Sequence, residues 1–404
     1  MRHSILTTAL FPAALALASC QGGEMGETTP SSTPTIAAAD GVVAGQRVSL
    51  ASDSPFAAAS HGTFAEPWAL AFEPGTGRVF VTEKRGAAKL YDPATGTVRE
   101  VGGMPQVAYG GQGGLGDVAF APDYATSRTI YLSWVKADQG DARRAVVGRG
   151  TLACDAAACR VENLQQIWQQ SVAIESPGHF SHKMAFSPDG RYLFVTSGER
   201  MQQAPAQDLS NNLGTVVRLT PNGRAAPGNP FADRAQATNA TAEIWTYGQR
   251  NLLGIAFDPQ GQLWEIEHGP AGGDELNRVD RGANYGWPVR SNGDQYNGDT
   301  IPDHTADDGF AHPAISWNPV IAPGDMIFYT GGMFADWRGQ VLVANLKTKS
   351  ISRVVTNAAG NSASEAARYD FPNRLRDIAQ APDGAVWVIE DGDNGRLLRL
   401  TPRS

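Results

Sequence analysis

One hydrophobic pattern recurs along the chain from about residue 62 to its end. Each copy begins with small and apolar residues, usually followed by phenylalanine. A turn with proline, aspartate or glycine comes next, and then a segment in which apolar and polar residues alternate. Alternation with a period of two is typical of a half-buried β-strand, so each copy predicts a β-hairpin. The copies lie at residues 69–82, 117–133, 183–195, 253–265, 325–343 and 377–389.

Six hairpins spaced by roughly 50 to 70 residues indicate a repeat architecture. Repeats of this length that contain only strands are typical of β-propellers, in which four-stranded sheets surround a common axis. We therefore predict an all-β fold, a six-bladed β-propeller, over residues 62–404. A ring needs all of its blades to close, so this span is expected to be one domain.

Composition supports this prediction and limits the possible partners. Of the 404 residues, 42% are apolar and 18% are charged, which is enough for a folded core. The 45 glycines and 25 prolines exceed average usage, as expected for a fold with many tight turns. The net charge of −8, without a run of Lys or Arg, argues against nucleic acid as a partner. It leaves room for a local basic pocket that binds an anion.

The first residues predict export. Arg2 and His3 precede an apolar stretch that is too short for a membrane-spanning helix, so residues 1–19 are expected to be a signal peptide. The stretch ends in Leu-Ala-Ser-Cys20, which resembles a bacterial lipobox, where the signal is cleaved before the cysteine and a lipid is attached. An ordinary secretory signal with a chance cysteine is the alternative.

Residues 20–61 are expected to be the lipidated cysteine and a flexible tether, because they are rich in Gly, Thr, Ser, Pro and Ala. Gln21 after the cysteine favours the outer membrane. We therefore expect a lipid-anchored, periplasm-facing protein of the bacterial cell envelope. In that oxidising compartment Cys154 and Cys159 predict a local disulfide across a turn, with a metal pair as the weaker alternative.

Three loop segments carry residues suited to chemistry. His179 lies before the third hairpin, although a single loop histidine is more often a surface residue. The Gly-Pro turn at 269–270 with nearby carboxylates offers the oxygen ligands that calcium prefers, or is simply a solvated acidic turn. Arg374 and Arg376, with Lys347 and Arg250, could form a cationic pocket for a polycarboxylate or phosphate, or be ordinary surface residues.

Eight segments in order resemble the pyrroloquinoline quinone (PQQ)-dependent aldose sugar dehydrogenases, the glucose/sorbosone dehydrogenase family. They extend over nearly all of residues 62–404. A single segment would be unspecific, but eight in order are specific. The segments are Gly111–Leu115, His179–Phe180, Gly248–Asn251, His268–Pro270 with Gly273–Glu275, Asn284–Pro288, Trp317–Pro323, Leu346–Lys347 and Asn373–Asp377.

The resemblance implies a role for each matching residue. His179 would be the catalytic base, and the main-chain oxygens of Gly269 and Pro270 would hold an active-site Ca²⁺ together with the cofactor. Glu275 and Tyr285 would hold a second, structural Ca²⁺. The residues expected to contact the quinone or the sugar are Gln112, Arg250, Asn251, Lys347, Arg374 and Arg376.

The implied reaction oxidises the C1 hydroxyl of a small aldose sugar to an aldonolactone. PQQ is a tricarboxylate, so Lys347 and the arginine pair suit its charge. Calcium would act as a Lewis acid on the quinone, and a neutral histidine would take the hydroxyl proton as hydride leaves C1. The electrons would then pass to a quinone or cytochrome that the sequence does not identify.

The chain departs from the family pattern next to the proposed base. Ser181, His182 and Lys183 stand where relatives usually have Gly, Gly and Arg. The added bulk and the change from a bidentate donor to a point charge are expected to affect substrate preference. His182 could also be mistaken for the base; His179 is preferred because Phe180 follows it in register.

Two other functions fit a six-bladed propeller. A calcium-dependent lactonase would hold a metal on the central axis with carboxylate and Asn ligands, and would have no use for Lys347, Arg374 and Arg376. A non-enzymatic, lipid-anchored surface module would need neither the histidine nor the calcium turn.

Overall fold

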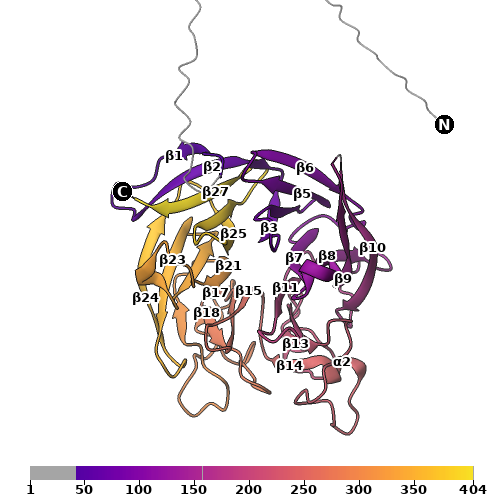
Figure 1. Cartoon of the computed structure of the whole chain (residues 1–404). Coiled ribbons are helices and arrows are strands. Elements are labelled where there is room, and N and C mark those ends of the chain that lie inside the picture. The colour runs from indigo at the N-terminus through magenta and orange to yellow at the C-terminus, as the bar shows by residue number, and fades with distance from the viewer. Residues whose placement is uncertain (1–41, 157, 404) are drawn as a thin grey trace, which may run out of the picture. The chain divides into compact units, whose positions relative to one another are not determined.

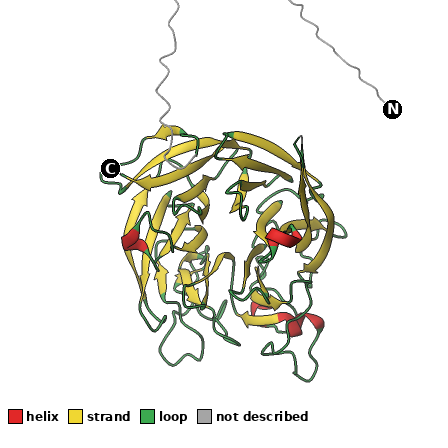
Figure 2. Ribbon diagram, viewed as in Figure 1, coloured by secondary structure: helices red, strands yellow, loops and turns green. Residues whose placement is uncertain are grey.

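Strands make up almost all regular structure in the part of the chain that the structure, a computed structural model, describes: residues 42–156 and 158–403. These residues belong to one unit, Ile36–Ser404. Figure 2 shows how short the helices are. They are α1 (Tyr124–Ser127), α2 (Asn239–Glu243) and two 3₁₀ turns, Ala204–Gln207 and Ala335–Trp337.

The predicted export signal and Cys20 lie outside the described residues. Within the described ranges, no helix has both the length and the apolar character needed to cross a membrane.

The strands form six antiparallel groups in chain order, and the first two groups join into one eight-stranded sheet through a parallel pairing of β6 with β10. The first two groups are β3 (Pro67–Phe72), β4 (Val79–Glu83), β5 (Ala87–Asp92) and β6 (Thr97–Gly102); and β7 (Leu115–Phe120), β8 (Thr129–Ala137), β9 (Arg143–Cys154) and β10 (Cys159–Gln169). The next two are β11 (Ser181–Phe186), β12 (Leu193–Ser197), β13 (Thr215–Leu219) and β14 (Ile244–Tyr247); and β15 (Leu252–Phe257), β16 (Leu263–Glu267), β18 (Asp274–Arg278) and β20 (Ile315–Trp317). The last two are β21 (Pro323–Phe328), β22 (Val341–Asn345), β23 (Ser350–Thr356) and β24 (Ala363–Asp370); and β25 (Leu375–Gln380), β26 (Val386–Glu390) and β27 (Gly395–Pro402), extended by β2 (Phe56–Phe64) and β1 (Gln46–Val48).

All six predicted hairpins are confirmed as antiparallel pairs that open the six groups. The first strands, β3, β7, β11, β15, β21 and β25, contact one another in that order, and β25 contacts β3. The series is therefore closed, and Figure 1 shows the groups following one another around it. A small separate sheet pairs β17 (Ala271–Gly272) with β19 (Gly293–Asp294).

The N-terminal strand β2 completes the last group, and this corrects the predicted tether. Phe56–Phe64 pairs antiparallel with β27, with Phe56 opposite Pro402 and Phe64 opposite Gly395, so the indigo and yellow strands lie side by side in Figure 1. Phe56 is fully buried and stacks on Phe371. The expectation of a tether up to residue 61 is wrong for β1 and β2, because a strand of Ala and Ser residues can be held by backbone pairing and a few aromatic anchors.

The third residue of each first strand lies at equivalent positions around the ring. These residues are Ala69, Asp117, Lys183, Gly254, Asp325 and Asp377. Lys183 Nζ lies 3.5 Å from Asp117, 3.1 Å from Asp325 and 3.3 Å from Asp377, and we call these four side chains the axial cluster. Lys183 thus joins strands from four groups through charge pairing inside the ring.

The axial cluster explains the departures near residue 183. Burial alone would lower the pKa of Lys183, but the three carboxylates raise it above its ordinary value, so the ammonium stays charged. His182 fills the space above Gly116, where a Cβ would lie 2.0 Å from the imidazole Cε1, and its Nδ1 lies 2.8 Å from Ser133 Oγ. Both side chains thus pack between strands, and their effect on substrate preference stays a prediction.

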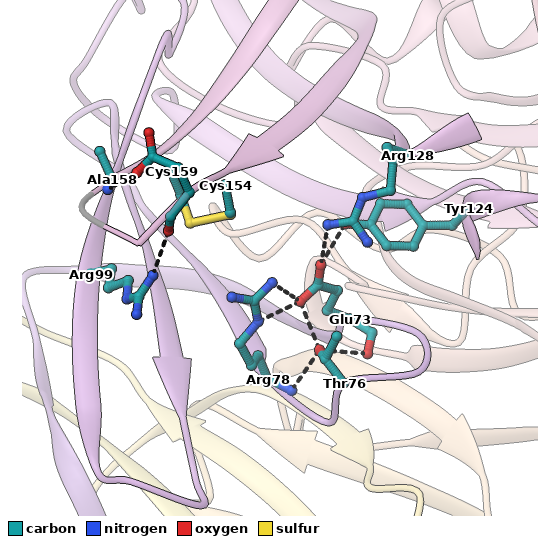
Figure 3. The surroundings of a disulfide bond; sticks show 10 residues. Glu73, Thr76, Arg78, Arg99, Tyr124, Arg128, Cys154, Ala158 and Cys159 are labelled. Carbon is teal, nitrogen blue, oxygen red and sulfur yellow. Dashed lines mark hydrogen bonds and ion pairs between the residues drawn. A yellow bond between two sulfur atoms is a disulfide. The ribbon is translucent and has the colours of Figure 1, made fainter. Parts of the chain in front are cut away.

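Cys154 and Cys159 face each other across the β9–β10 turn and are joined by a disulfide, with a Cα–Cα distance of 4.1 Å (Figure 3). Figure 3 also shows the buried carboxylate of Glu73, which accepts hydrogen bonds from Arg78, Tyr124 and Arg128. Charge-assisted bonds of this kind tie the first group to the second.

Candidate functional site

The predicted site residues lie at one end of the ring. In an antiparallel group the start of the first strand and the connection between the second and third strands lie at the same end. Residues at starts of first strands are Gln112, His179, Arg250, Asn251, Arg374 and Arg376. Residues in the connections between second and third strands are Lys84, Glu199, Gly269, Pro270, Lys347 and Asp391.

His179 is held on both its main chain and its side chain. It is buried, with a backbone φ of 50°, and its backbone N–H donates to Gln112 Oε1 at 2.7 Å. Its Nδ1 lies 2.5 Å from Glu199 Oε1. A neutral imidazole that donates from Nδ1 to a carboxylate keeps the lone pair on Nε2. Glu199 therefore orients His179 as a proton acceptor.

The surroundings of His179 and Glu199 lower the pKa of both groups. Burial lowers the pKa of His179 below its ordinary value, against the opposing effect of Glu199, so the imidazole is neutral at pH 7. Burial would raise the pKa of Glu199, but the bond from His179 and the N–H of Gln203 lower it overall. Glu199 was missed from the sequence, because it lies twenty residues beyond the histidine in a connection without a motif.

Arg250 and Asn251 are buried beside this pair. Glu267 Oε2 accepts the backbone N–H of Arg250 at 2.6 Å and that of Asn251 at 3.2 Å. The Arg250 guanidinium donates to the carbonyl oxygens of His268 at 3.1 Å and Gly269 at 2.8 Å. Its position is therefore fixed by the connection that was predicted to hold calcium.

His268 links the residues that the structure brings together. Its Nε2 lies 2.7 Å from Pro323 O, and burial lowers its pKa to about 3, with contributions from Arg250, His179 and Arg376. A neutral His268 therefore lies among these charged and titratable groups without adding charge to them.

Arg374 and Arg376 share one carboxylate. Arg374 Nε lies 2.8 Å from Asp391 Oδ2, and Arg376 donates to Asp391 Oδ1 from Nε and Nη2. The Arg376 guanidinium also lies 4.5 Å from the ring centre of Trp68. Two cations and one carboxylate leave a net positive charge, as the predicted cationic pocket requires.

Lys84 adds a cation that no motif indicated. Its Nζ donates to Gly111 O at 2.6 Å, next to Gln112. Burial lowers its pKa, and both Glu66 and Arg376 act on it, which places the ammonium within electrostatic range of Arg376. The exposed Lys347 lies on the β22–β23 turn at the same end. Its side chain makes no hydrogen bond or ion pair with the other candidates in the part of the chain that is described.

A second cluster consists of buried acids behind Arg250. Asn277 Nδ2 lies 2.9 Å from Glu265, 3.4 Å from Glu267 and 3.4 Å from Glu275. Burial and mutual repulsion raise the pKa of Glu265 and Glu275 well above the ordinary value. Glu265 Oε2 is buried and has no hydrogen-bond partner among the described residues. Three carboxylates so close together need protons or a cation.

A small cavity of about 10 Å³ adjoins this cluster. It is lined by Arg250, Glu267, His268, Gly269, Gly273, Glu275, Tyr285, Trp287, Arg290 and Ser291. The Tyr285 hydroxyl donates to Arg278 O and accepts from the N–H of Asp280, so only the main chain of Tyr285 could supply a metal ligand.

Another group with metal-ligand atoms lies on the loop before β20. His304, Asp308 and His312 have such atoms within 4.8 Å of one another. The Asp308 carboxylate already accepts hydrogen bonds from His304, His312 and the N–H groups of Thr305 and Phe310. These hydrogen bonds explain why the three side chains lie together: they hold the loop in its conformation.

Comparisons with known proteins identify the family of the chain. The profile of the Glucose / Sorbosone dehydrogenase family matches residues 64–399. The chain belongs to this family. It is 36% identical over 343 residues to aldose sugar dehydrogenase YliI of Escherichia coli (strain K12). The match covers 84% of this chain and 90% of the Escherichia coli protein.

Two solved structures extend the family comparison. The apo soluble aldose sugar dehydrogenase of Escherichia coli has a TM-score of 0.80, 34% identity, and covers 86% of this chain and 99% of its own. The PQQ-bound aldose sugar dehydrogenase of Streptomyces coelicolor has a TM-score of 0.68, 26% identity, and covers 85% of this chain and 96% of its own. The predicted family and its β-propeller fold are thus confirmed.

Proposed function

We propose that this family member is a PQQ- and calcium-dependent dehydrogenase that oxidises the C1 hydroxyl of aldoses to aldonolactones. The observation that carries the proposal is the neutral, buried His179, oriented by Glu199, at the same end of the ring as Arg250, Arg374 and Arg376. We further propose that the six strand groups are the six blades of the propeller over residues 62–404, with β1 and β2 completing the last blade.

His179 acts as the general base. Its Nε2 accepts the proton of the anomeric hydroxyl, which converts the imidazole to an imidazolium. Glu199 stabilises this cation through its 2.5 Å contact with Nδ1. Gln112 fixes the main chain of His179. Ser181 Oγ, 3.3 Å from Asn251 Oδ1, connects the loop of the base to the neighbouring blade. These contacts hold the acceptor nitrogen in place before the sugar arrives.

The cationic residues fit a tricarboxylate cofactor. When bound, PQQ supplies the two-electron redox chemistry by accepting hydride from C1. The exposed Lys347 and the arginine pair would bind its carboxylates, since Asp391 neutralises only one of the two guanidinium charges. Gln112, Arg250 and Asn251 would contact the quinone or the sugar beside it. The buried Asn251 Nδ2 has no hydrogen-bond partner among the described residues, so it is available as a donor.

Calcium fits the acidic cluster. Glu275, with the main-chain oxygen of Tyr285, would hold a structural Ca²⁺, and Glu265 and Glu267 would add negative charge close by. The main-chain oxygens of Gly269 and Pro270 would hold a second ion together with the cofactor. Gly269 O accepts a bond from Arg250 in this structure, so an ion there would share the oxygen with a guanidinium.

A Glu275→Gln substitution is expected to remove the calcium dependence of stability. In the unaltered protein, calcium at a hundred times its dissociation constant should raise the free energy of unfolding by about 2.7 kcal/mol. Urea unfolding with calcium or with a chelator measures this difference, and the exposed Glu162→Gln serves as the matched control. An unaltered protein that unfolds identically in both solutions would contradict the structural calcium site.

The axial cluster argues against the lactonase alternative. That function needs a metal on the central axis, but the axial carboxylates of Asp117, Asp325 and Asp377 already bind Lys183 Nζ. A non-enzymatic surface module gives no reason for a buried, oriented His179 beside unneutralised cations. Neither alternative is favoured by an observation of its own.

Reconstitution tests the proposed function directly. Purified protein is mixed with PQQ and calcium, and dye reduction is measured with a panel of aldoses. We expect sugar-dependent reduction and quinone absorbance that remains after dialysis. The proposal would be disproved if no sugar supported dye reduction and the quinone absorbance was lost on dialysis. The physiological acceptor is proposed to be a quinone or a cytochrome, and electron transfer to each in purified form would identify it.

We also propose that the protein is exported and held in the bacterial outer membrane, facing the periplasm, by a lipid on Cys20. The lipobox-like sequence at residues 17–20 supports this proposal. Labelled fatty acid should be incorporated into the unaltered protein and not into Cys20→Ser. Equal labelling of the two proteins would disprove the anchor.

A further inference from the structure

Two exposed apolar side chains flank the candidate site. Tyr296 is 74% exposed and Met201 is 49% exposed. Met201 belongs to the β12–β13 connection at the end of the ring that carries His179 and Arg250. Tyr296 belongs to the β18–β20 connection, which reaches the same end where β19 pairs with β17. Large apolar side chains left in water at the edge of a site often contact a ligand. Neither residue belongs to a segment on which the family resemblance rests.

Tyr296 is placed over Arg250 by a well-bonded turn. Its hydroxyl lies 3.5 Å from Arg250 Nη2, and its ring centre lies 5.8 Å from the guanidinium. The turn is closed by a bond from Gln295 N–H to Asp299 O at 2.9 Å. Gln203 Nε2 also donates to Gln295 Oε1 at 3.3 Å. Since Gln203 belongs to the loop that carries Glu199, this contact joins the Tyr296 turn to the loop that orients the base.

Met201 is exposed on the loop that carries Glu199, and the backbone of this loop is strained at Arg200 and Met201. Arg200 and Met201 both have left-handed φ angles, 63° and 59°. Arg200 anchors the loop, because its buried guanidinium donates to the carbonyl oxygens of Gly178, Arg143 and Ser176. The next side chain is Met201, whose Sδ lies over Gly178, 3.0 Å from where a Cβ would be. The thioether therefore lies beside the residue that precedes His179.

We propose that Tyr296 and Met201 form an apolar rim that contacts the non-reacting C–H face of the aldose ring and sets the affinity for the sugar. The inference rests on the proposed function. A pyranose has polar edges and an apolar face, so it needs polar partners, such as His179 and Arg250, and an apolar surface beside them. An aromatic ring and a polarisable thioether supply that surface.

Substitution of Tyr296 tests the rim. Tyr296→Ala should raise KM for the best aldose about tenfold, equivalent to the loss of about 1.4 kcal/mol, while kcat changes by less than about twofold, because the interaction is made equally in ground and transition states. Tyr296→Phe should keep KM within about threefold, because it retains the ring. Met201→Ala should raise KM by about threefold, as loss of a thioether contact predicts.

The controls separate the rim from the cofactor site. PQQ affinity, measured by titration of quinone absorbance, should be the same in all variants, and Val355→Ala replaces an exposed apolar residue on β23, outside the site connections. An unchanged KM in Tyr296→Ala, or a weakened PQQ affinity in that variant, would overturn the rim. An unaltered protein that binds PQQ but oxidises no aldose would instead overturn the proposed function.

Discussion

Replacing His179 with alanine is expected to lower kcat for sugar oxidation by at least about 10², the usual contribution of a general base. The alanine cannot accept the anomeric proton, and the cationic residues that would hold PQQ are left in place. Dye reduction in the reconstituted protein gives the rate, and quinone absorbance after dialysis gives the cofactor content. The expected result is a slow enzyme that still retains PQQ.

The second buried imidazole of the same segment provides the control. His182→Ala removes a side chain whose Nδ1 lies 2.8 Å from Ser133 Oγ, whereas Nδ1 of His179 lies 2.5 Å from the Glu199 carboxylate. This variant should lose less than about tenfold in kcat, because its packing role does not involve the proton. A full rate in His179→Ala combined with a large loss in His182→Ala would reverse the assignment of the base.

The pH profile follows from the same pair. Only neutral His179 can accept a proton, and burial lowers its pKa below the ordinary value. The rate should therefore be constant near pH 7 and fall as the pH drops through this lowered pKa. In Glu199→Gln the stabilising carboxylate is lost, so the midpoint should move to still lower pH and kcat should fall. A midpoint that does not move would show that Glu199 has only a structural role.

The sequence pattern predicted the strands well because each first strand repeats the same burial requirement. Short segments with several apolar residues begin at 69, 117, 183, 253, 325 and 377, and every one of these segments lies in a first strand. The starts of these strands are also where His179, Arg250 and Arg374 occur, so short motifs could indicate the site. The sequence was therefore sufficient to predict those strands and site residues that depend on neighbouring residues in the chain.

Residues that depend on long-range contacts were not predictable in this way. Glu199 and Lys84 lie in connections of ordinary composition, and only the fold brings them to His179 and Gln112. The strand Phe56–Phe64 has few strongly apolar residues, so its pairing with the last strand of the chain left no periodic signal. Closure of a ring is a property of the two ends together, and neither end displays it alone.

Lys183 shows how a departure from the family pattern is accommodated by the fold. Its ammonium lies 3.5 Å from a carboxylate oxygen of Asp117, and Gly254 leaves room for Asp325, since a Cβ there would lie 3.0 Å from Asp325 Oδ1. The charges and the space around them form one unit that connects strands distant in the sequence.

Replacing Lys183 with methionine should lower the free energy of unfolding at pH 7 by about 3 to 5 kcal/mol, the usual cost of breaking a buried ion pair. Methionine keeps most of the volume but leaves Asp117, Asp325 and Asp377 without a cation. Urea unfolding measures the loss. Lys183→Arg should lose less because it keeps the charge, and the exposed Lys136→Met should have little effect.

The pH dependence of this loss distinguishes charge from packing. Burial raises the pKa of Asp117 and Asp325 above their ordinary values in the folded state. A carboxyl whose pKa is raised on folding binds protons more tightly when folded, so lowering the pH through this range stabilises the fold. Lys183 opposes this rise in both carboxyls, so its loss in Lys183→Met raises their pKa further, and the deficit should shrink between pH 7 and pH 5. The Lys183→Met/Asp325→Asn double variant should recover part of the deficit at pH 7, because it removes one unpaired charge. A deficit that is equal at both pH values and unchanged in the double variant would show that Lys183 stabilises the ring by packing alone.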